Sequence, residues 1–420
     1  LFFTTFSSIA LEDSSNSVHN ALLSKAAQPQ ALKTSLATSM RRVSTGSLSG
    51  VGTRADIPMD LTISAFTNIQ PIGSGEFANV FKAEDSTEKG NWVALKVLKR
   101  EHKGKESVYQ DFFSEEQVLS KLCGTKHIVE ILGAGLTEDD RPFVVLEMLK
   151  EQTLAGRYLK EDSWKKRLTW ALHVAEALAC LQSGIKTEEH MVFHRDLKPA
   201  NIGFELKTDS IKLLDFGLVC AVNKSKFVGD QEGEVEAGKA GKGEKGGKGE
   251  TKKGDPKNDK LHKRVAKEKT PAGAFLYNLT GNTGSLRYMS PEVAWNKPYN
   301  EKSEVYSWAI VCWQIIEQRV PFAVHSHVSM GKVVHAPPYV RDTMTPELWP
   351  YGIDELVQLS WSHDIDKRPS FAVIVKALRK VLEHEEARGP PNRTKPILPA
   401  FLCCGSQVYD DDNLIRDMLS

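Results

Sequence analysis

The sequence has few cysteines, almost no net charge and no long apolar run. With 55 Lys and Arg residues against 54 Asp and Glu residues, its net charge of +1 excludes a strongly basic nucleic-acid-binding protein. No stretch of ~18 apolar residues occurs, so we expect no transmembrane helix in this chain. Six cysteines are scattered over the 420 residues without the spacing of a disulfide framework or of zinc ligands. This favours a reducing compartment and predicts a cytoplasmic protein, with membrane attachment through a region before Leu1 left open.

Composition divides the chain into a folded middle and segments with little to bury. Residues 1–56, rich in Ser, Thr and Ala, predict a disordered tail, and residues 389–420 predict a C-terminal tail. Between Lys224 and Lys269, 14 Lys and Arg residues accompany 9 Asp and Glu residues, and glycine is frequent. Such a segment cannot bury enough apolar surface to offset chain entropy. We therefore expect a disordered insert at about 224–270 inside a domain at 66–384.

Strand-like runs come first in the domain, and long helical patterns follow. The strand-like runs lie at residues 66–72, 80–83, 92–98, 130–135 and 142–149, with one helical pattern at 107–122. The later helical patterns lie at residues 164–181, 303–317, 354–361 and 371–384. This order predicts an α+β protein with a small, mostly β N-terminal lobe at about 66–148 and a larger, mostly helical C-terminal lobe at about 149–384.

Two features of the first lobe suit a polyphosphate ligand. Gly73 and Gly75 lie in a turn between strand-like runs, where glycine permits backbone N–H groups to approach phosphate closely. Lys96 lies in a run that is apolar on both sides. An ammonium group there needs an anionic partner, because burying an unpaired charge is costly. The following helix offers Glu115 and Glu116 as partners.

A specific pair of segments follows in the second lobe. His194–Asn201 reads HRDLKPAN, and Asp215 begins the triplet Asp-Phe-Gly further on. With the glycine turn and Lys96 in this order, the stretch from Phe66 to His384 resembles the eukaryotic protein kinases. The resemblance implies a bilobal kinase fold, the cofactors ATP and Mg²⁺, and transfer of the γ-phosphate to serine or threonine hydroxyls of protein substrates.

The second-lobe segments supply groups for phosphoryl transfer. Amide and carboxylate oxygens suit Mg²⁺, so Asn201 and Asp215 are the candidate metal ligands. Asp196 has the chemistry to orient and deprotonate the incoming hydroxyl, and Lys198 to neutralise the γ-phosphate. These four residues are the predicted catalytic and metal-binding set.

The resemblance also implies the nucleotide contacts. Lys96 would hold the α- and β-phosphates and pair with Glu115, with Glu116 as the alternative. The residues expected around ATP are Ile72, Gly73, Gly75, Val80, Ala94, Lys96, Glu115, Leu146, Glu147 and Met148. The apolar residue expected at the floor of the adenine pocket is Gly203, which predicts either modest nucleotide affinity or a floor filled by a neighbouring side chain.

Several residues indicate the branch of the family. Lys198, and Ser285 in the run GSLRYMSPE, are similar to serine/threonine kinases. Glu292 in that run is expected to pair with Arg368, and such a buried pair would lock the lower lobe. The segment from Trp361 through Arg368, followed by Pro-Ser-Phe, resembles the tyrosine-kinase-like branch, with its Raf-like, plant and protist members.

Two departures from the family pattern leave other functions open. Ala78 stands where a third glycine is usual, and Glu304 stands where an aspartate normally caps the catalytic-loop backbone. The extra methylene of Glu304 predicts some loss of rigidity around His194 and Arg195. A pseudokinase, acting as a nucleotide-binding signalling scaffold, is therefore the alternative. A pure interaction protein, using the insert to bind an acidic partner, is a third possibility.

The region around the insert predicts regulation. Arg195 precedes the catalytic aspartate, and in kinases with this arginine a phosphate on the activation segment often pairs with it. Thr280 and Thr283 are the candidate phosphorylation sites. The Gly/Lys insert would lie near the mouth of the substrate site, where it would recruit acidic partners or block access, or be a passive surface loop.

Overall fold

In the computed structural model, the residues that can be described are 57–183, 190–223, 266–323, 325, 342–345, 348–350 and 352–388. The predicted tails at 1–56 and 389–420 and most of the predicted insert, 224–265, lie outside these residues. The chain divides into two units, Leu1–Asp60 and Leu61–Ser420. The second unit contains all the helices and strands described below.

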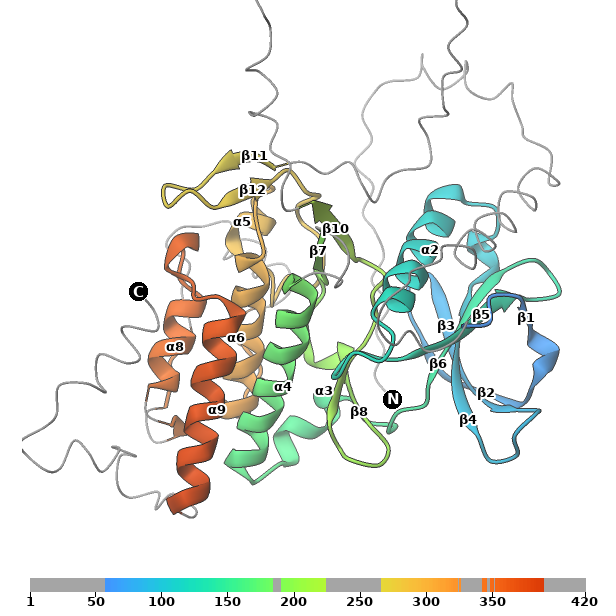
Figure 1. Ribbon diagram of the computed structural model, residues 1–420, viewed down its shortest axis with the longest axis horizontal. Coiled ribbons are helices and arrows are strands. Elements are labelled where there is room, and N and C mark those ends of the chain that lie inside the picture. The colour runs from blue at the N-terminus through green and yellow to red at the C-terminus, as the bar shows by residue number, and fades with distance from the viewer. Residues whose placement is uncertain are drawn as a thin grey trace, which may run out of the picture. The chain divides into compact units, whose positions relative to one another are not determined.

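Six strands of the N-terminal lobe form one sheet in the order β1-β5-β6-β4-β3-β2 (Figure 1). The strands are β1 (Leu61–Thr62), β2 (Phe66–Ser74), β3 (Ala78–Asp85), β4 (Trp92–Leu98), β5 (Ile131–Leu136) and β6 (Pro142–Glu147). β1 runs parallel to β5, and the other neighbours are antiparallel. The five predicted strands are confirmed. The two-residue β1 is too short to leave a periodic pattern in the sequence.

Alternation along the strands builds the core of this sheet. Val93, Leu95 and Val97 are buried on one face of β4, and Phe143 and Val145 of β6 join them. Alternate residues of a strand point to the same face, which is why Lys96 lies on the opposite face from this cluster. Helix α2 (Glu106–Lys121) packs against β5 and β6 and matches the predicted helix to within one residue.

Helices dominate the C-terminal lobe (Figure 1). The long ones are α4 (Trp164–Ser183), α6 (Lys302–Glu317), α8 (Ile353–Ser360) and α9 (Phe371–Arg388). α6 is buried along nearly its whole length, and the indole of Trp308 donates a hydrogen bond to Ala171 O of α4 at 3.0 Å. All four predicted helices are confirmed, and the α+β fold with two lobes is confirmed with them.

Short elements of the C-terminal lobe complete the fold. They are β7 (His190–Phe193), β8 (Ile202–Phe204), β9 (Ile211–Leu213), β10 (Cys220–Asn223), β11 (Ala266–Lys269), β12 (Phe275–Tyr277), α3 (Leu154–Arg157) and α5 (Pro291–Ala294). They pair as β7 with β10, β8 with β9, and β11 with β12. The predicted insert extends too far toward the C-terminus, because its residues Ala266–Lys269 form β11 through backbone pairing with β12.

Across the described residues, no helix combines the length and the apolar character that a membrane crossing requires.

Candidate active site

A cleft of about 720 Å³ is lined by residues of both lobes. It falls within the size range of small-molecule sites. The predicted residues that line it are Ile72, Gly75, Val80, Ala94, Lys96, Glu115, Leu146, Glu147, Met148, Asp196, Lys198, Asn201 and Asp215. Gly73 is not among the residues lining this cleft. The carboxylate of Glu147 bonds the backbone N–H of Glu130 at 2.8 Å and pairs with Lys212 at 2.8 Å.

Lys96 is held by one carboxylate from each lobe. Its Nζ donates to both oxygens of Glu115 at 2.6 and 2.7 Å and to Asp215 Oδ1 at 2.9 Å. Burial alone would lower the pKa of Lys96, but the two carboxylates outweigh it and raise that pKa above its ordinary value. The ammonium group therefore stays charged, the form in which a lysine side chain can bind a phosphate.

The structure brings Glu115, not Glu116, to Lys96. One residue turns a helix by about 100°, so the two carboxylates of α2 face different surroundings. Glu116 is buried and accepts a hydrogen bond from Ser120 Oγ at 3.1 Å. Burial raises the pKa of Glu116 to about 7.

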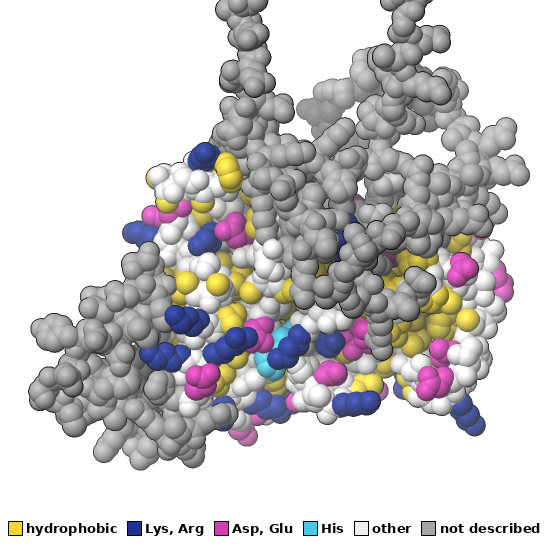
Figure 2. Space-filling model, in the orientation of Figure 1, with side chains coloured by type: hydrophobic (Ala, Val, Ile, Leu, Met, Phe, Trp, Pro, Cys, Tyr) yellow, Lys and Arg dark blue, Asp and Glu magenta, His cyan; other side chains and the backbone are white. Residues whose placement is uncertain are grey.

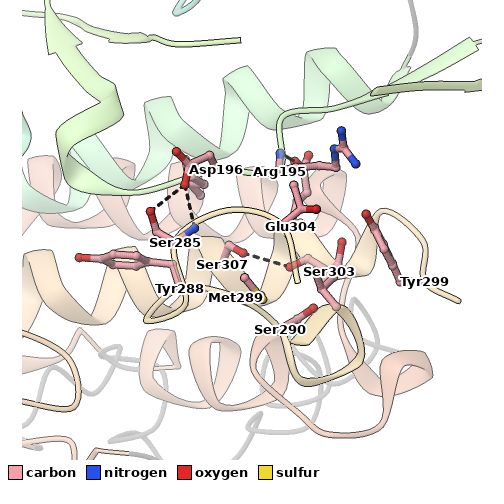
Figure 3. A pocket seen from close by; sticks show the side chains of 13 residues that line it. Arg195, Asp196, Ser285, Tyr288, Met289, Ser290, Tyr299, Ser303, Glu304 and Ser307 are labelled. Carbon is pink, nitrogen blue, oxygen red and sulfur yellow. Dashed lines mark hydrogen bonds between the residues drawn. The ribbon is translucent and has the colours of Figure 1, made fainter. Parts of the chain in front are cut away.

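Asp196 is the centre of a hydrogen-bonded cluster (Figure 3). Its Oδ1 accepts from the backbone N–H and the hydroxyl of Ser285 at 2.9 and 2.8 Å. Its Oδ2 accepts from Lys198 Nζ at 2.7 Å and from Asn201 Nδ2 at 3.1 Å. Lys198 is also 3.0 Å from Ser285 Oγ. The cluster fixes the carboxylate in the cleft and joins it to the segment at 284–292.

Asn201 and Asp215 offer oxygen atoms suited to Mg²⁺. The amide nitrogen of Asn201 donates to the backbone carbonyl of Asp196 at 2.9 Å and to the Asp196 carboxylate. The amide oxygen of Asn201 is therefore left for another ligand. Asp215 has a left-handed backbone (φ 58°), and its side chain is 51% exposed. Lys96 outweighs the effect of burial and lowers the pKa of Asp215, so it is ionised at neutral pH. Two hard oxygen donors on one cleft therefore fit a magnesium site.

Glu304 caps the loop that carries Asp196. Its Oε1 accepts from the backbone N–H groups of His194 and Arg195 at 2.6 and 2.9 Å, so one oxygen makes both bonds despite the longer side chain. Burial raises the pKa of Glu304 to about 7, against the opposing effect of those two bonds. The loss of rigidity expected from the extra methylene stays a prediction.

Leucine side chains occupy the space beside Gly203. A Cβ placed on Gly203 would lie 2.8 Å from Leu149 Cδ1 and 3.1 Å from Leu214 Cδ1. Leu149 and Leu214 both line the cleft. This arrangement favours the second of the two sequence-based alternatives, in which neighbouring side chains fill the floor. The sequence pattern did not indicate Leu149 or Leu214, because the packing of two separate chain segments places these side chains beside Gly203.

Arg195 and Thr283 line the same small pocket, which Asp196 also lines. Arg195 Nε donates to Leu218 O at 2.6 Å, whereas its buried Nη1 has no hydrogen-bond partner among the described residues. The Thr283 hydroxyl donates locally, to the carbonyls of Thr280 and Gly281 at 3.2 and 3.1 Å. Thr280 is exposed.

Glu292 and Arg368 form the expected buried pair. Two parallel bonds of 2.6 and 2.9 Å join the guanidinium to the carboxylate. Arg368 is 1% exposed and also donates to the carbonyls of Ser362 and Lys302, at 2.8 and 3.0 Å. These bonds join the segment after Tyr288 to the start of α6 and to the loop before α9.

Comparisons with known proteins agree with this geometry. Residues 66–235 match the protein kinase domain family, and residues 267–378 match the protein tyrosine and serine/threonine kinase family. The chain is 30% identical over 328 residues to the serine/threonine-protein kinase VIK of Arabidopsis thaliana, covering 76% of this chain and 60% of VIK.

Further relatives extend the comparison. The serine/threonine-protein kinase CTR1 of Arabidopsis thaliana is 26% identical over 351 residues, covering 82% of this chain and 34% of CTR1. The dual specificity protein kinase shkD of Dictyostelium discoideum is 27% identical over 322 residues, covering 74% of this chain and 34% of shkD. The chain thus spans between a third and three fifths of the lengths of these relatives.

Proposed function

This chain belongs to the protein kinase family, and from that premise we propose that it transfers the γ-phosphate of ATP to serine and threonine hydroxyls of protein substrates. The observation that carries the proposal is the cluster in which Lys198, Asn201 and Ser285 all bond the Asp196 carboxylate at the edge of the cleft. The plant and Dictyostelium relatives agree with the branch that the sequence predicted.

Five side chains of this protein would each have a role in phosphoryl transfer. Lys96 would bind the α- and β-phosphates, and Asn201 and Asp215 would hold Mg²⁺, which neutralises phosphate charge when bound. Lys198, at 2.7 Å from Asp196, would stabilise charge on the transferred group. Asp196 would orient the substrate hydroxyl and accept its proton.

Ser285 supports serine or threonine as the acceptor. Its hydroxyl bonds the Asp196 carboxylate at 2.8 Å and lies 3.0 Å from Lys198 Nζ, and so fixes this segment beside the carboxylate. A short serine or threonine side chain of a substrate lying over the segment would reach the carboxylate. The names of several relatives, serine/threonine-protein kinase and dual specificity protein kinase, agree with this acceptor class.

An Asp196→Asn variant tests the proposal. Because the amide cannot accept the hydroxyl proton, we expect transfer of labelled phosphate to a mixed serine/threonine peptide library to fall about 10²–10⁴-fold. Nucleotide binding should persist, because Lys96 and Asp215 are unchanged. Asp354→Asn, at the start of α8, is the matched control and should retain full transfer.

Two results would contradict a catalytic role. Undiminished transfer by Asp196→Asn would exclude Asp196 as the proton acceptor. No transfer by the wild-type chain, with nucleotide still bound, would support the pseudokinase scaffold.

We also propose that phosphorylation of the segment at 280–283 regulates the enzyme. The supporting observation is the buried Arg195 Nη1, without a partner among the described residues, in a pocket that Thr283 lines. A phosphate there would form charge-assisted bonds and order the segment. Thr280→Ala with Thr283→Ala should lower activity strongly and remove its sensitivity to phosphatase. Full activity of the double variant would exclude this switch.

A further inference from the structure

A second cluster of ligand-type side chains lies outside the active-site cleft. His173 and Glu176 are three residues apart on α4, a spacing that puts both on one face of the helix. His127 comes from the loop before β5, where its left-handed backbone (φ 64°) is tied by a 2.8 Å hydrogen bond between its carbonyl and Leu213 N. One ligand atom from each of the three residues lies within 4.8 Å of the others.

His127 is held in the orientation of a metal-binding imidazole. Its Nδ1 is 3.2 Å from the carbonyl oxygen of Ile211 and 3.1 Å from Ser210 Oγ. A carbonyl oxygen only accepts, so the ring satisfies this contact by carrying its proton on Nδ1 and leaving a lone pair on Nε2. A hydrogen bond from the second ring nitrogen is the usual way in which proteins orient such ligands.

Nε2 of His127 faces a carboxylate. It is 3.0 Å from Glu176 Oε2 and, with the ring proton on Nδ1, has no hydrogen to donate to that oxygen. His173 stacks on His127, with ring centroids 4.1 Å apart, and its buried Nδ1 has no partner among the described residues. One ligand-type atom from each of the three residues thus lies in the same partly buried region.

The charges around the cluster leave one carboxylate oxygen available. Arg379 binds only Oε1 of Glu176, at 3.0 Å from its Nε, and thereby orients the carboxylate. Lys126 approaches Oε2 no closer than 3.9 Å, and its side chain is 77% exposed, so it is free to move aside.

We propose that His127, His173 and Glu176 form a site for a divalent transition-metal ion, and specifically for Zn²⁺. Two imidazoles and one carboxylate suit zinc, whereas Mg²⁺ prefers oxygen ligands. Two tetrahedral bonds of about 2.0–2.1 Å place their ligand atoms ~3.3 Å apart. The ligand atoms of the three residues lie within 4.8 Å of one another, so the half-buried His173 ring has to rotate out of its stack on His127 to close the site.

Solvent has a route to the proposed site. His127 and His173 both line a surface cavity together with Lys126, Lys166 and Ser210. A histidine patch among Lys and Arg side chains is visible on the face shown in Figure 2. Three protein ligands would leave a fourth position for water or for a group that enters this cavity.

The test uses the full chain with Cys403→Ser and Cys404→Ser, which removes adjacent thiols that could bind zinc. After treatment with a chelator, ZnCl₂ is titrated by calorimetry in excess Mg²⁺, and thermal unfolding is followed with and without zinc. We expect one zinc per chain and a higher unfolding midpoint, because a ligand that binds the folded state stabilises it. Co²⁺ in place of zinc should give the strong visible absorption of a tetrahedral site.

Matched variants locate the zinc. His173→Gln and Glu176→Gln should each weaken zinc binding at least about 10-fold and abolish the cobalt absorption. His102→Gln and Glu355→Gln, which lie outside the cluster, should bind zinc as the parent does. Wild-type affinity in His173→Gln, or no zinc retained by the parent protein, would overturn the proposal. Loss of zinc in Asp215→Asn would instead assign it to the active-site cleft.

Discussion

The two oxygens of the Glu304 carboxylate have different surroundings. One carboxylate oxygen takes both backbone N–H groups of the catalytic loop, and the other, Oε2, has no partner among the described residues. A carboxylate with an unsatisfied buried oxygen is poorly solvated, and this is the physical cause of its pKa of about 7. The residue is therefore poised to titrate near neutral pH.

This gives a stability prediction with a definite sign. In the unfolded chain Glu304 ionises near its ordinary value of 4.5, and in the folded chain near 7, so the folded state binds the proton more tightly. Its contribution is fully present below about pH 4.5 and is lost as pH rises to about 7, a change on the order of 3 kcal/mol. Glu304→Gln cannot titrate. Urea unfolding at several pH values should show the stability of wild type falling relative to this variant. Parallel profiles would contradict the prediction.

Arg368 carries a second prediction at the level of single residues. It is fully buried and bonds Glu292 through two nitrogens. Arg368→Met leaves the Glu292 carboxylate buried without its partner, which should cost about 3–5 kcal/mol in urea unfolding. Arg368→Met combined with Glu292→Leu should recover part of that loss. A double variant as unstable as the sum of the two single ones would show that the residues do not act as a pair.

Most candidate residues could be predicted from the sequence, and so could the pairs Lys96–Glu115 and Glu292–Arg368. Lys96, Asp196, Asn201 and Asp215 come from motifs of fixed spacing, and the structure places all four on one cleft. The proposed zinc ligands follow no motif, because His127 and the α4 pair meet only through packing of the loop before β5 against that helix.

Among the elements, long periodic segments were predictable and short ones were not. The helices from α2 to α9 with more than two turns all match their predicted ranges to within a few residues. β7 to β12 have three or four residues each, too few for a period, and β7 pairs with a strand that lies far along the chain. The same reason explains why β11 was assigned to the disordered insert.

The segment between β12 and α5 contacts the catalytic loop through Gly284. This glycine has φ +95°, and a Cβ there would lie 2.2 Å from Arg195 O and 3.5 Å from Asp196 Oδ1. Gly284→Ala should therefore displace Ser285 from Asp196 and lower kcat at least about 10-fold. Gly273→Ala is the control, because its φ of +88° gives the same backbone strain with nothing within 4 Å. Equal activity of the two variants in a peptide phosphorylation assay would argue against this contact.

At the scale of the whole molecule, the insert separates two strands that each pair with a neighbour outside the insert. β10 pairs with β7 before it, and β11 pairs with β12 after it. The kinase domain can therefore form its strands on either side without help from residues 224–265. Replacing residues 230–260 by a short Gly/Ser linker should leave the thermal unfolding midpoint unchanged and alter substrate choice or basal rate. If a peptide-library assay shows neither change, the insert is a passive loop.

Lys96 already contacts three carboxylate oxygens, and these contacts oppose the binding of any nucleotide phosphate that enters the cleft. Its ammonium group already satisfies carboxylates from both lobes, so an arriving phosphate has to compete with Asp215 for the same three protons. Any affinity of the cleft for ATP would then reflect the difference between the ionic contacts of Lys96 with the two carboxylates and those with the incoming phosphate.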